Sequence, residues 1–574
     1  MNTIQAWQDL LAQFFVFNPR APFIFTSLMF WVFFAFVLAI DGFIYRKRPV
    51  RHAFLFLVSL FFYYKTSGFF FILLLSTVCS DFIIAGRISK TENAVGRKLW
   101  LALSIFIDLG LLVYFKYAYF FTQSCNELFH THYTVFNWLA YWANGFTGGG
   151  FTVSRIILPV GISFFVFQSI SYTVDVYRKN LQPLKRITDY GFYVSFFPQL
   201  VAGPIVRASE FIPQLFREYR LTKVQFGMDV FWILNGLVKK IFLSDYIAAN
   251  FIDRVFINPS ASTGFENLTA LYGYSLQVYA DFSGYTDIAI GVAALMGFTL
   301  SKNFNSPYKA TSVSDFWRRW HISLSTWLRD YLYIPLGGNR GASMVSYFAI
   351  GTIAGAITLL SGSWLVLWIS LFIIISCAIL ARLYNTIGLW IATNVNLMVT
   401  MLLGGLWHGA SWNFLIWGGL NGFGLVFYKV WKRISPWDNK NTWYKRAWAI
   451  FLTFSFITFT RVWFRAGSGS TWADFEATHN IRSEFENAII MFRKIFMEMD
   501  WSIAPRVVTE FSTVFSVIAA GMIIHWLPEK FKEKYRATFA ALPYWAIILS
   551  ALVVVLIVFQ VLSADLHPFI YFQF

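Results

Sequence analysis

Apolar runs long enough to cross a lipid bilayer recur along the whole chain, and they constrain its fold more than any single motif. The first is Phe23–Tyr45 and the last is Tyr544–Leu562. A membrane-spanning helix needs roughly 20 mostly apolar residues, and by this rule we expect about 11–14 membrane segments. Charged residues make up only 13% of the 574 residues, which is too few for a soluble protein of this size. The sequence therefore predicts an all-α, polytopic membrane protein.

Short basic clusters between the apolar runs predict how the chain is oriented. Lysines and arginines gather at residues 46–51, 87–98, 178–186, 432–446 and 530–536. Cytoplasmic loops are enriched in both residues, so we place these clusters on the cytoplasmic side. Both termini then face outward, as do the loops Gln123–Ser154 and Gly467–Thr509. We expect these outer loops to be caps or partner surfaces of one membrane domain covering residues 1–574.

Composition also excludes several classes of function. The net charge of +17 lies in the short clusters rather than in a soluble basic domain, so nucleic acid is not an expected partner. The three cysteines show no metal-ligand spacing, which predicts neither a metal site nor a disulfide framework. No cleavable leader is expected, because Phe23–Tyr45 is long enough to remain in the membrane.

Polar residues inside apolar runs are the informative ones, because they are costly at membrane depth and mark pathways or sites. Gln168 lies on a polar stripe of the run Leu158–Tyr177. This stripe either lines a substrate path or forms hydrogen bonds between helices. Asp281 and Asp287 lie in another apolar stretch. Each is either a substrate contact or the partner of an arginine in the next loop.

The densest polar segment is Asn303–Arg340, which alternates aromatic and basic residues. Ser314 is a candidate helix N-cap, with a helix from Asp315 on which Trp317, His321 and Leu324 share a face. Such a helix is either interfacial, with tryptophans at the lipid headgroups, or one wall of a site for a phosphate-bearing donor. In the second case Arg318, Arg319, Arg329 and Arg340 supply the counter-charges.

A single histidine, His408, stands in the apolar run that ends at Asn421. Gly404, Gly405 and Gly409 leave space around its ring, and Ser411 and Asn413 offer hydrogen-bond partners. A neutral imidazole is a suitable general base near neutral pH. A lone buried histidine is otherwise more often a structural residue.

These stretches resemble the membrane-bound O-acyltransferase family, and within it the bacterial branch of alginate O-acetylation and teichoic acid D-alanylation. The matching segments are Leu158–Tyr177, Phe197–Arg207, Tyr279–Asp287, Asn303–Arg340, Met401–Gly419, Trp463–Ala466 and Pro568–Phe574. The resemblance implies a ring of tilted helices around a transmembrane tunnel, with a catalytic core at residues 156–431. It also implies that an acyl donor comes from the cytoplasm and an acceptor hydroxyl from the other side.

The resemblance further implies that His408 is the catalytic histidine and that His321 is its second conserved position. His408 then deprotonates the acceptor hydroxyl or takes the acyl group, while His321 orients or polarises the donor. The candidate substrate-binding residues are Gln168, Asp281, Trp317, Arg318, Arg319, Trp320, Arg329, Asp330, Asn339, Arg340, Trp407 and Asn413.

The expected reaction is transfer of an acetyl group to an extracytoplasmic polysaccharide or other envelope glycan. The donor substrate is then acetyl-CoA, with no bound cofactor. The expected location is the cytoplasmic (inner) membrane of a bacterium, and the partners are the lipid bilayer and a periplasmic or extracellular acyltransferase protein. D-alanyl transfer to a teichoic acid, a channel or transporter, and a docking platform for a soluble partner remain the alternatives.

Overall fold

A computed structural model describes residues 12–18, 23–147, 149, 152–201, 203–341, 344–361, 364–435, 442–467 and 481–562. Within these ranges the secondary structure is helical and contains no strand, which confirms the predicted all-α fold. The final motif Pro568–Phe574 lies outside the described residues, as does the first part of the predicted outer loop, residues 468–480.

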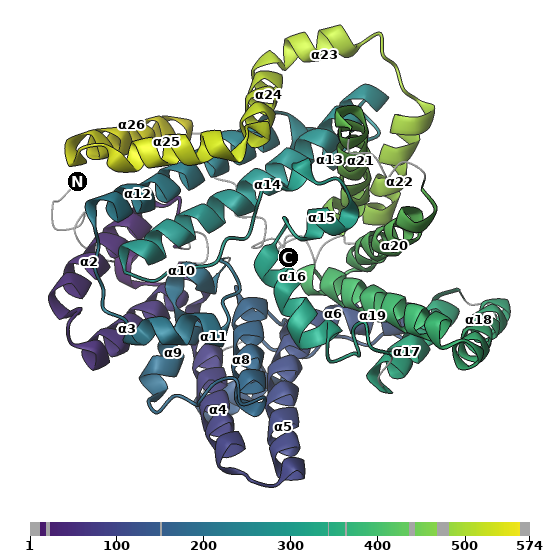
Figure 1. The fold of residues 1–574 in the computed structure, drawn as a ribbon, viewed down its shortest axis with the longest axis horizontal. Coiled ribbons are helices and arrows are strands. Elements are labelled where there is room, and N and C mark those ends of the chain that lie inside the picture. Colours follow the sequence, from purple (N-terminus) through teal and green to yellow (C-terminus); the bar gives the residue numbers. More distant parts are fainter. Residues whose placement is uncertain are drawn as a thin grey trace.

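Long helices surround a centre made of short ones (Figure 1). The N-terminal part consists of α2 (Leu28–Ile44), α3 (Arg48–Ser67), α4 (Phe71–Lys90), α5 (Ala94–Leu112), α6 (Ala118–Phe129), α7 (Trp138–Thr147), α8 (Ile162–Tyr177) and α9 (Ile187–Ser195). The middle contains α12 (Lys223–Val238), α14 (Gly264–Leu295), α15 (Val313–Trp317) and α16 (Ile322–Leu328). The C-terminal part consists of α17 (Met344–Ser361), α18 (Trp364–Leu383), α19 (Asn385–His408), α20 (Trp412–Ile434), α21 (Trp443–Gly467), α22 (Ile481–Met497), α23 (Ala504–Glu510), α24 (Ser512–Trp526), α25 (Glu529–Ala541) and α26 (Tyr544–Leu562).

The apolar runs predict more membrane spans than there are described helices that are long and apolar enough to form a simple span. Among the described residues, Arg48–Lys90, Ala94–Phe129, Asn385–His408 and Trp443–Ala466 are long and apolar enough, which makes four. Two bent helix pairs raise the number to six if each pair is one span. The difference from the expected 11–14 has a physical reason. Helices such as α2 and α8 have only 17 and 16 residues, and α14 carries two buried carboxylates.

The pair α12 and α14 forms the tightest helix contact of the middle part. A Cβ atom at Gly284 would lie 2.8 Å from the carbonyl oxygen of Gly236, so only glycine lets the two backbones approach this closely. At the same interface Lys240 pairs with Asp281 at 2.7 Å, and Lys239 pairs with Asp287 at 2.7 Å. The predicted arginine of the next loop is therefore wrong as the partner of these carboxylates. Lys239 and Lys240, which directly follow α12, neutralise them instead.

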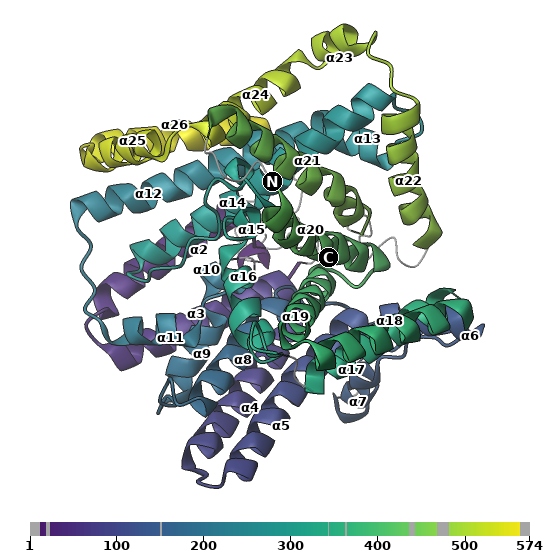
Figure 2. The ribbon, with the colours of Figure 1, turned by 45° about the vertical axis from the view of Figure 1, so that its right-hand side comes forward.

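Part of the predicted outer loop 467–509 is a packed helix. The aromatic side chains of α22 lie on α21, with ring centroids of Trp463 and Phe485 5.1 Å apart and those of Phe459 and Phe496 5.5 Å apart. Figure 2 shows α22 beside α21, on the side of the molecule that also carries α20. The position of this loop outside the cytoplasm stays a prediction.

Candidate active site

His408 is the last residue of α19 and is 3% exposed. The helix reaches this position because Gly405 and Gly418 let α19 and α20 touch, since a Cβ atom at Gly405 would lie 3.1 Å from the Cα of Gly418. Aromatic rings enclose the imidazole. Its centroid lies 5.1 Å from that of Trp417 and 5.3 Å from that of Phe464. Burial among rings holds the imidazole in one place and removes it from bulk water.

Two side chains from a distant part of the chain cap the helix end that carries His408. The last carbonyl groups of a helix have no partner within it. Here Lys116 Nζ donates to the carbonyl oxygen of Trp407 at 2.6 Å and to that of His408 at 3.3 Å. Tyr117 Oη donates to the carbonyl oxygen of Leu406 at 2.6 Å. A buried ammonium group is also favourable at the negative end of the helix dipole.

The helix predicted from Asp315 through Leu324 is interrupted, which corrects two expectations. Its N-cap is Ser312, whose Oγ accepts from the Asp315 N–H, and not Ser314. The helix α15 ends at Trp317, and His321 adopts the left-handed conformation with φ 44° before α16 begins. Trp317, His321 and Leu324 therefore do not share a helix face.

The loop before α15 causes this interruption by competing for backbone hydrogen bonds. The carbonyl oxygen of Asn303 accepts from the Ile322 N–H at 3.0 Å, and its side-chain oxygen accepts from the Ser323 N–H at 3.2 Å. The Asn305 N–H in turn donates to the carbonyl of Arg319 at 2.9 Å. These bonds hold residues 318–321 as a turn that directs His321 inward, where it is fully buried.

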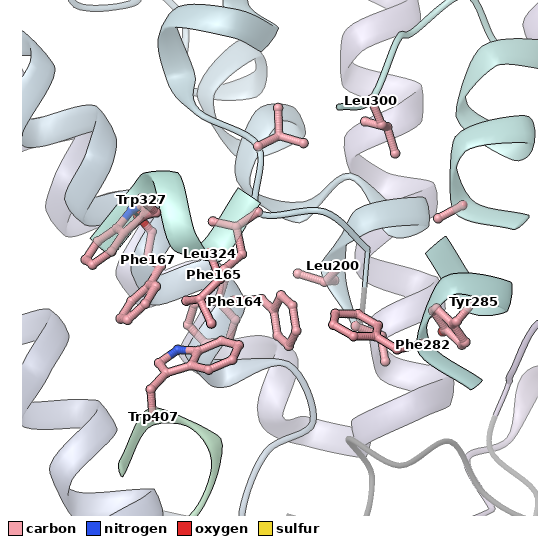
Figure 3. Packing of buried hydrophobic residues seen from close by; sticks show 14 of the residues in the cluster. Phe164, Phe165, Phe167, Leu200, Phe282, Tyr285, Leu300, Leu324, Trp327 and Trp407 are labelled. Carbon is pink, nitrogen blue, oxygen red and sulfur yellow. Dashed lines mark hydrogen bonds between the residues drawn. The ribbon is translucent and has the colours of Figure 1, made fainter. Parts of the chain in front are cut away.

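The two histidines lie close together. Their ring centroids are 6.3 Å apart, and Phe282 of α14 covers the His321 ring at 4.7 Å. An aromatic stack fixes the neighbouring Trp407. Trp327 of α16 lies parallel to Phe167 of α8 at 3.8 Å, and Phe167 lies 5.6 Å from Trp407 (Figure 3). Side chains from two other helices, α8 and α16, thus set the position of the residue that precedes His408.

A cavity of about 570 Å³ opens beside His408. Its inner wall contains His408, Gly404 and Trp417, and its basic side chains are Arg318, Arg329, Lys429 and Lys432. Among the described residues, only Arg329 of these four pairs with a carboxylate, that of Asp330. The cavity therefore joins a histidine at its inner wall to cationic groups that are available to an anion.

The predicted substrate-binding residues divide into two groups. Those on the wall of this cavity are Trp317, Arg318, Arg329 and Asn339. Those that do not line it are Gln168, Asp281, Arg319, Trp320, Asp330, Arg340, Trp407 and Asn413. Of these, Arg319 pairs with Asp315 at 2.9 Å. Gln168 is buried, and its side-chain amide has no hydrogen-bond partner among the described residues.

Asp330 ties the arginines at the cavity rim together. It accepts from Arg329 and lies 2.6 Å from Arg207 Nη1. Burial raises the pKa of the Asp330 carboxyl, but the hydrogen bonds and charges of Arg329 and Arg207 outweigh this effect and hold the pKa below its ordinary value. Asp330 is thus an anion that orients Arg329, and it does not line the cavity itself.

Sequence reasoning missed several residues around His408, namely Lys116, Phe282, Trp417, Lys429, Lys432, Arg461 and Phe464. A usable signal existed for two of them. Lys116 and Arg461 are charged residues within apolar runs, and such residues mark sites by default. Both lie outside the predicted core of residues 156–431.

Comparison with known proteins places the chain in a family. Residues 88–354 match the model of the membrane-bound O-acyltransferase family. This matched range includes His321 but not His408. The chain is 33% identical to the peptidoglycan O-acetyltransferase of Helicobacter pylori over 453 residues, 74% of this chain and 72% of that protein. It is 36% identical to the probable alginate O-acetylase of Azotobacter vinelandii over 394 residues, 67% of this chain and 65% of that protein.

A more distant relative is the teichoic acid D-alanyltransferase of Bacillus subtilis, 28% identical over 322 residues, 53% of this chain and 68% of that protein. For the alginate relatives the matched stretch spans about half to two thirds of their length, 65% in Azotobacter vinelandii and 51% in Pseudomonas aeruginosa. With its long apolar helices, this chain is a multi-pass membrane protein that belongs to the membrane-bound O-acyltransferase family.

Proposed function

We propose that the chain is an O-acetyltransferase that carries an acetyl group from acetyl-CoA to a hydroxyl of an extracytoplasmic polysaccharide or other envelope glycan. The observation that carries this proposal is the 570 Å³ cavity with His408 on its inner wall and basic side chains around it. The activities for which the relatives are named, alginate O-acetylation and peptidoglycan O-acetylation, support the acyl group and the class of acceptor.

The charges of the cavity match a phosphate-bearing donor. Arg318, Lys429 and Lys432 line it and have no carboxylate partner among the described residues. Guanidinium and ammonium groups both bind phosphates, the first in a fixed planar geometry and the second as a point charge. In the proposed complex these side chains hold the phosphates of CoA, and the thioester reaches inward to His408.

The chemistry assigned to His408 is general acid–base catalysis. The acceptor hydroxyl attacks the thioester carbonyl carbon, a C–O bond forms, and the imidazole takes the hydroxyl proton. The C–S bond then breaks, and the imidazole returns the proton to the sulfur. His321 does not line the cavity, so we assign it a positioning role beside His408 rather than contact with the donor.

The proposed setting is the cytoplasmic membrane of a bacterium, with the basic cavity facing the cytoplasm and the glycan and a periplasmic or extracellular partner protein on the opposite side. The expected result of deleting the chain is loss of O-acetyl esters from one class of envelope glycan, measured by mass spectrometry. The wild-type chain restores the esters, and the mass added to the glycan distinguishes acetyl from D-alanyl. Unchanged envelope glycans in the deletion strain would contradict the proposal and favour a channel or transporter.

The same strain supplies a biochemical assay. Membranes containing the chain receive radiolabelled acetyl-CoA and envelope glycan purified from the deletion strain, and label in the glycan is counted. This transfer assay gives kcat and the KM for acetyl-CoA separately.

The cap on α19 leads to a prediction in this assay. In Lys116→Met the carbonyls of Trp407 and His408 lose their donor and the helix end loses its cation. We expect kcat to fall about tenfold, with the KM for acetyl-CoA unchanged, because a misplacement of the catalytic group lowers the rate without weakening donor binding. Lys116→Arg is expected to restore part of the rate.

The matched control is Lys98→Met, an exposed lysine of α5. It is expected to leave both constants unchanged. A Lys116→Met protein with normal kcat would show that the cap does not position His408.

A further inference from the structure

A second, much smaller cavity lies on the other side of His408. It measures about 10 Å³, which is close to the space that one water molecule needs. His408 and Trp417 separate it from the large cavity, since both residues line both spaces. The small cavity extends toward α14, α20 and α21, and its wall also includes Phe282, Asn421, Arg461 and Phe464.

Arg461 brings a full positive charge to this cavity. The side chain lies in α21, a helix long and apolar enough to span a membrane, and is 3% exposed. No carboxylate pairs with it among the described residues. Its Nη1 donates to the carbonyl of Ser275 at 3.2 Å and to Tyr308 Oη at 2.5 Å, and its other N–H groups have no hydrogen-bond partner within the described ranges.

A structural role for Arg461 accounts for only part of this arrangement. The guanidinium lies 4.5 Å from the centroid of the Trp320 ring, and such a cation–π contact stabilises a desolvated cation. This contact does not offset the whole cost of removing an ion from water unless the remaining donors of the ion are also satisfied. Charged residues at membrane depth are for this reason functional by default. The unsatisfied N–H groups beside the cavity indicate a ligand that accepts hydrogen bonds.

Asn421 adds a hydrogen-bond acceptor to the cavity. Its Nδ2 donates to the carbonyl of Trp417 at 2.9 Å, whereas its Oδ1 is buried without a partner among the described residues. The cavity thus offers a cationic donor, an amide acceptor and the His408 imidazole. A hydroxyl group suits this set, because it accepts a hydrogen bond from the guanidinium and donates its single hydrogen either to the amide oxygen or to the imidazole.

We propose that Arg461 and Asn421 bind the acceptor hydroxyl in this small cavity and that Arg461 is a catalytic residue. The proposal rests on the acyltransferase function. The guanidinium donates to the hydroxyl oxygen, while Asn421 Oδ1 and His408 face its hydrogen. As His408 takes the proton, Arg461 stabilises the partial negative charge on the hydroxyl oxygen, and this charge passes to the carbonyl oxygen of the thioester as the C–O bond to the acetyl carbon forms.

The size of the cavity fits this assignment. The small cavity accommodates a single oxygen atom rather than a sugar ring. The sugar ring that bears the hydroxyl therefore remains outside the small cavity. The aromatic side chains that close the cavity, among them Phe464, have to shift to admit the carbon next to that oxygen.

The test is the transfer assay on membranes that contain Arg461→Ala. We expect kcat to fall about 100-fold, the lower end of what removal of one charge-stabilising donor costs, with the KM for acetyl-CoA unchanged within about twofold. Added guanidinium chloride at millimolar concentration is expected to raise kcat of the variant at least about tenfold, because the deleted side chain leaves a space that fits a guanidinium ion. A purely structural arginine gives no such rescue.

A second variant keeps the proposal testable if Arg461→Ala fails to fold. Asn421→Leu preserves the approximate volume and removes Oδ1, and we expect the KM for the purified glycan to rise about tenfold at unchanged KM for acetyl-CoA. Arg465→Gln is the matched control, since Arg465 lies one turn further along α21 and pairs with Asp253 instead. It is expected to keep both KM values and to show no response to guanidinium.

The outcomes separate this inference from the proposed function. If His408→Ala is inactive while Arg461→Ala retains its rate, or loses it without guanidinium rescue, the acceptor site is overturned and the acyltransferase stands. If the wild-type membranes transfer no acetyl group at all, the proposed function itself fails.

Discussion

Replacing His408 by alanine is expected to lower kcat for acetyl transfer about 1,000-fold, within the range that loss of a general base produces. The physical reason is that this imidazole borders both cavities together with Trp417, which carries no group able to take a proton. The KM for acetyl-CoA should change little, because separate basic side chains are assigned to donor binding. The transfer assay on membranes measures both constants.

The control for this experiment is a histidine without a role in the site. His132 is exposed, and His132→Ala is expected to transfer acetyl at the wild-type rate. Size-exclusion chromatography of the detergent-solubilised variants verifies that His408→Ala is folded. Transfer by a folded His408→Ala protein within about threefold of wild type would remove His408 from the mechanism.

The contact between α19 and α20 leads to the second prediction, which compares two adjacent glycines. A Cβ at Gly418 would overlap the carbonyl oxygen of Met401 and lie 3.2 Å from the Cα of Gly405. We expect Gly418→Ala to force the helices apart and to destabilise the protein by about 3 kcal/mol, the upper end of overpacking costs. Because His408 lies at the end of α19, kcat should fall as well.

Gly419→Ala is the matched control, because the same change one residue later meets only the Leu402 side chain at 3.4 Å. Alanine favours a helix over glycine by up to about 1 kcal/mol, so this variant should be as stable as wild type or more so. The readout is the midpoint of thermal unfolding in detergent. Equal midpoints for the two variants would mean that the close approach of α19 and α20 is not needed for stability.

The sequence predicts the helical membrane fold and identifies His408 and His321 as candidate site residues, but it does not predict how the two histidines are held. Apolar runs are a local signal, so the fold class follows from them directly. Lys116 contacts the carbonyl of Trp407 across 291 residues, and no local pattern reports a contact of that range. The predicted arginine partner of Asp281 and Asp287 is wrong for the same reason, since lysines of a packed helix neutralise both carboxylates.

The segment around His321 shows a different limit. Its residues favour a continuous helix, yet the backbone and side chain of Asn303 take over the hydrogen bonds that the helix needs. The resulting turn leaves Trp317 and Arg318 on the cavity wall and pairs Arg319 with Asp315. Helical spacing alone is therefore a poor guide to which arginines of this motif face a donor.

The shared wall of the two cavities has a consequence for the membrane itself. An enzyme that passes a chemical group from one side of a bilayer to the other has to avoid becoming a leak for ions. Here the large cavity stops at His408 and Trp417, and a space for a single oxygen atom begins behind them. In this arrangement ions have no open path past the two side chains, so His408, which we assign to catalysis, and its neighbour Trp417 would also preserve the electrical seal of the membrane.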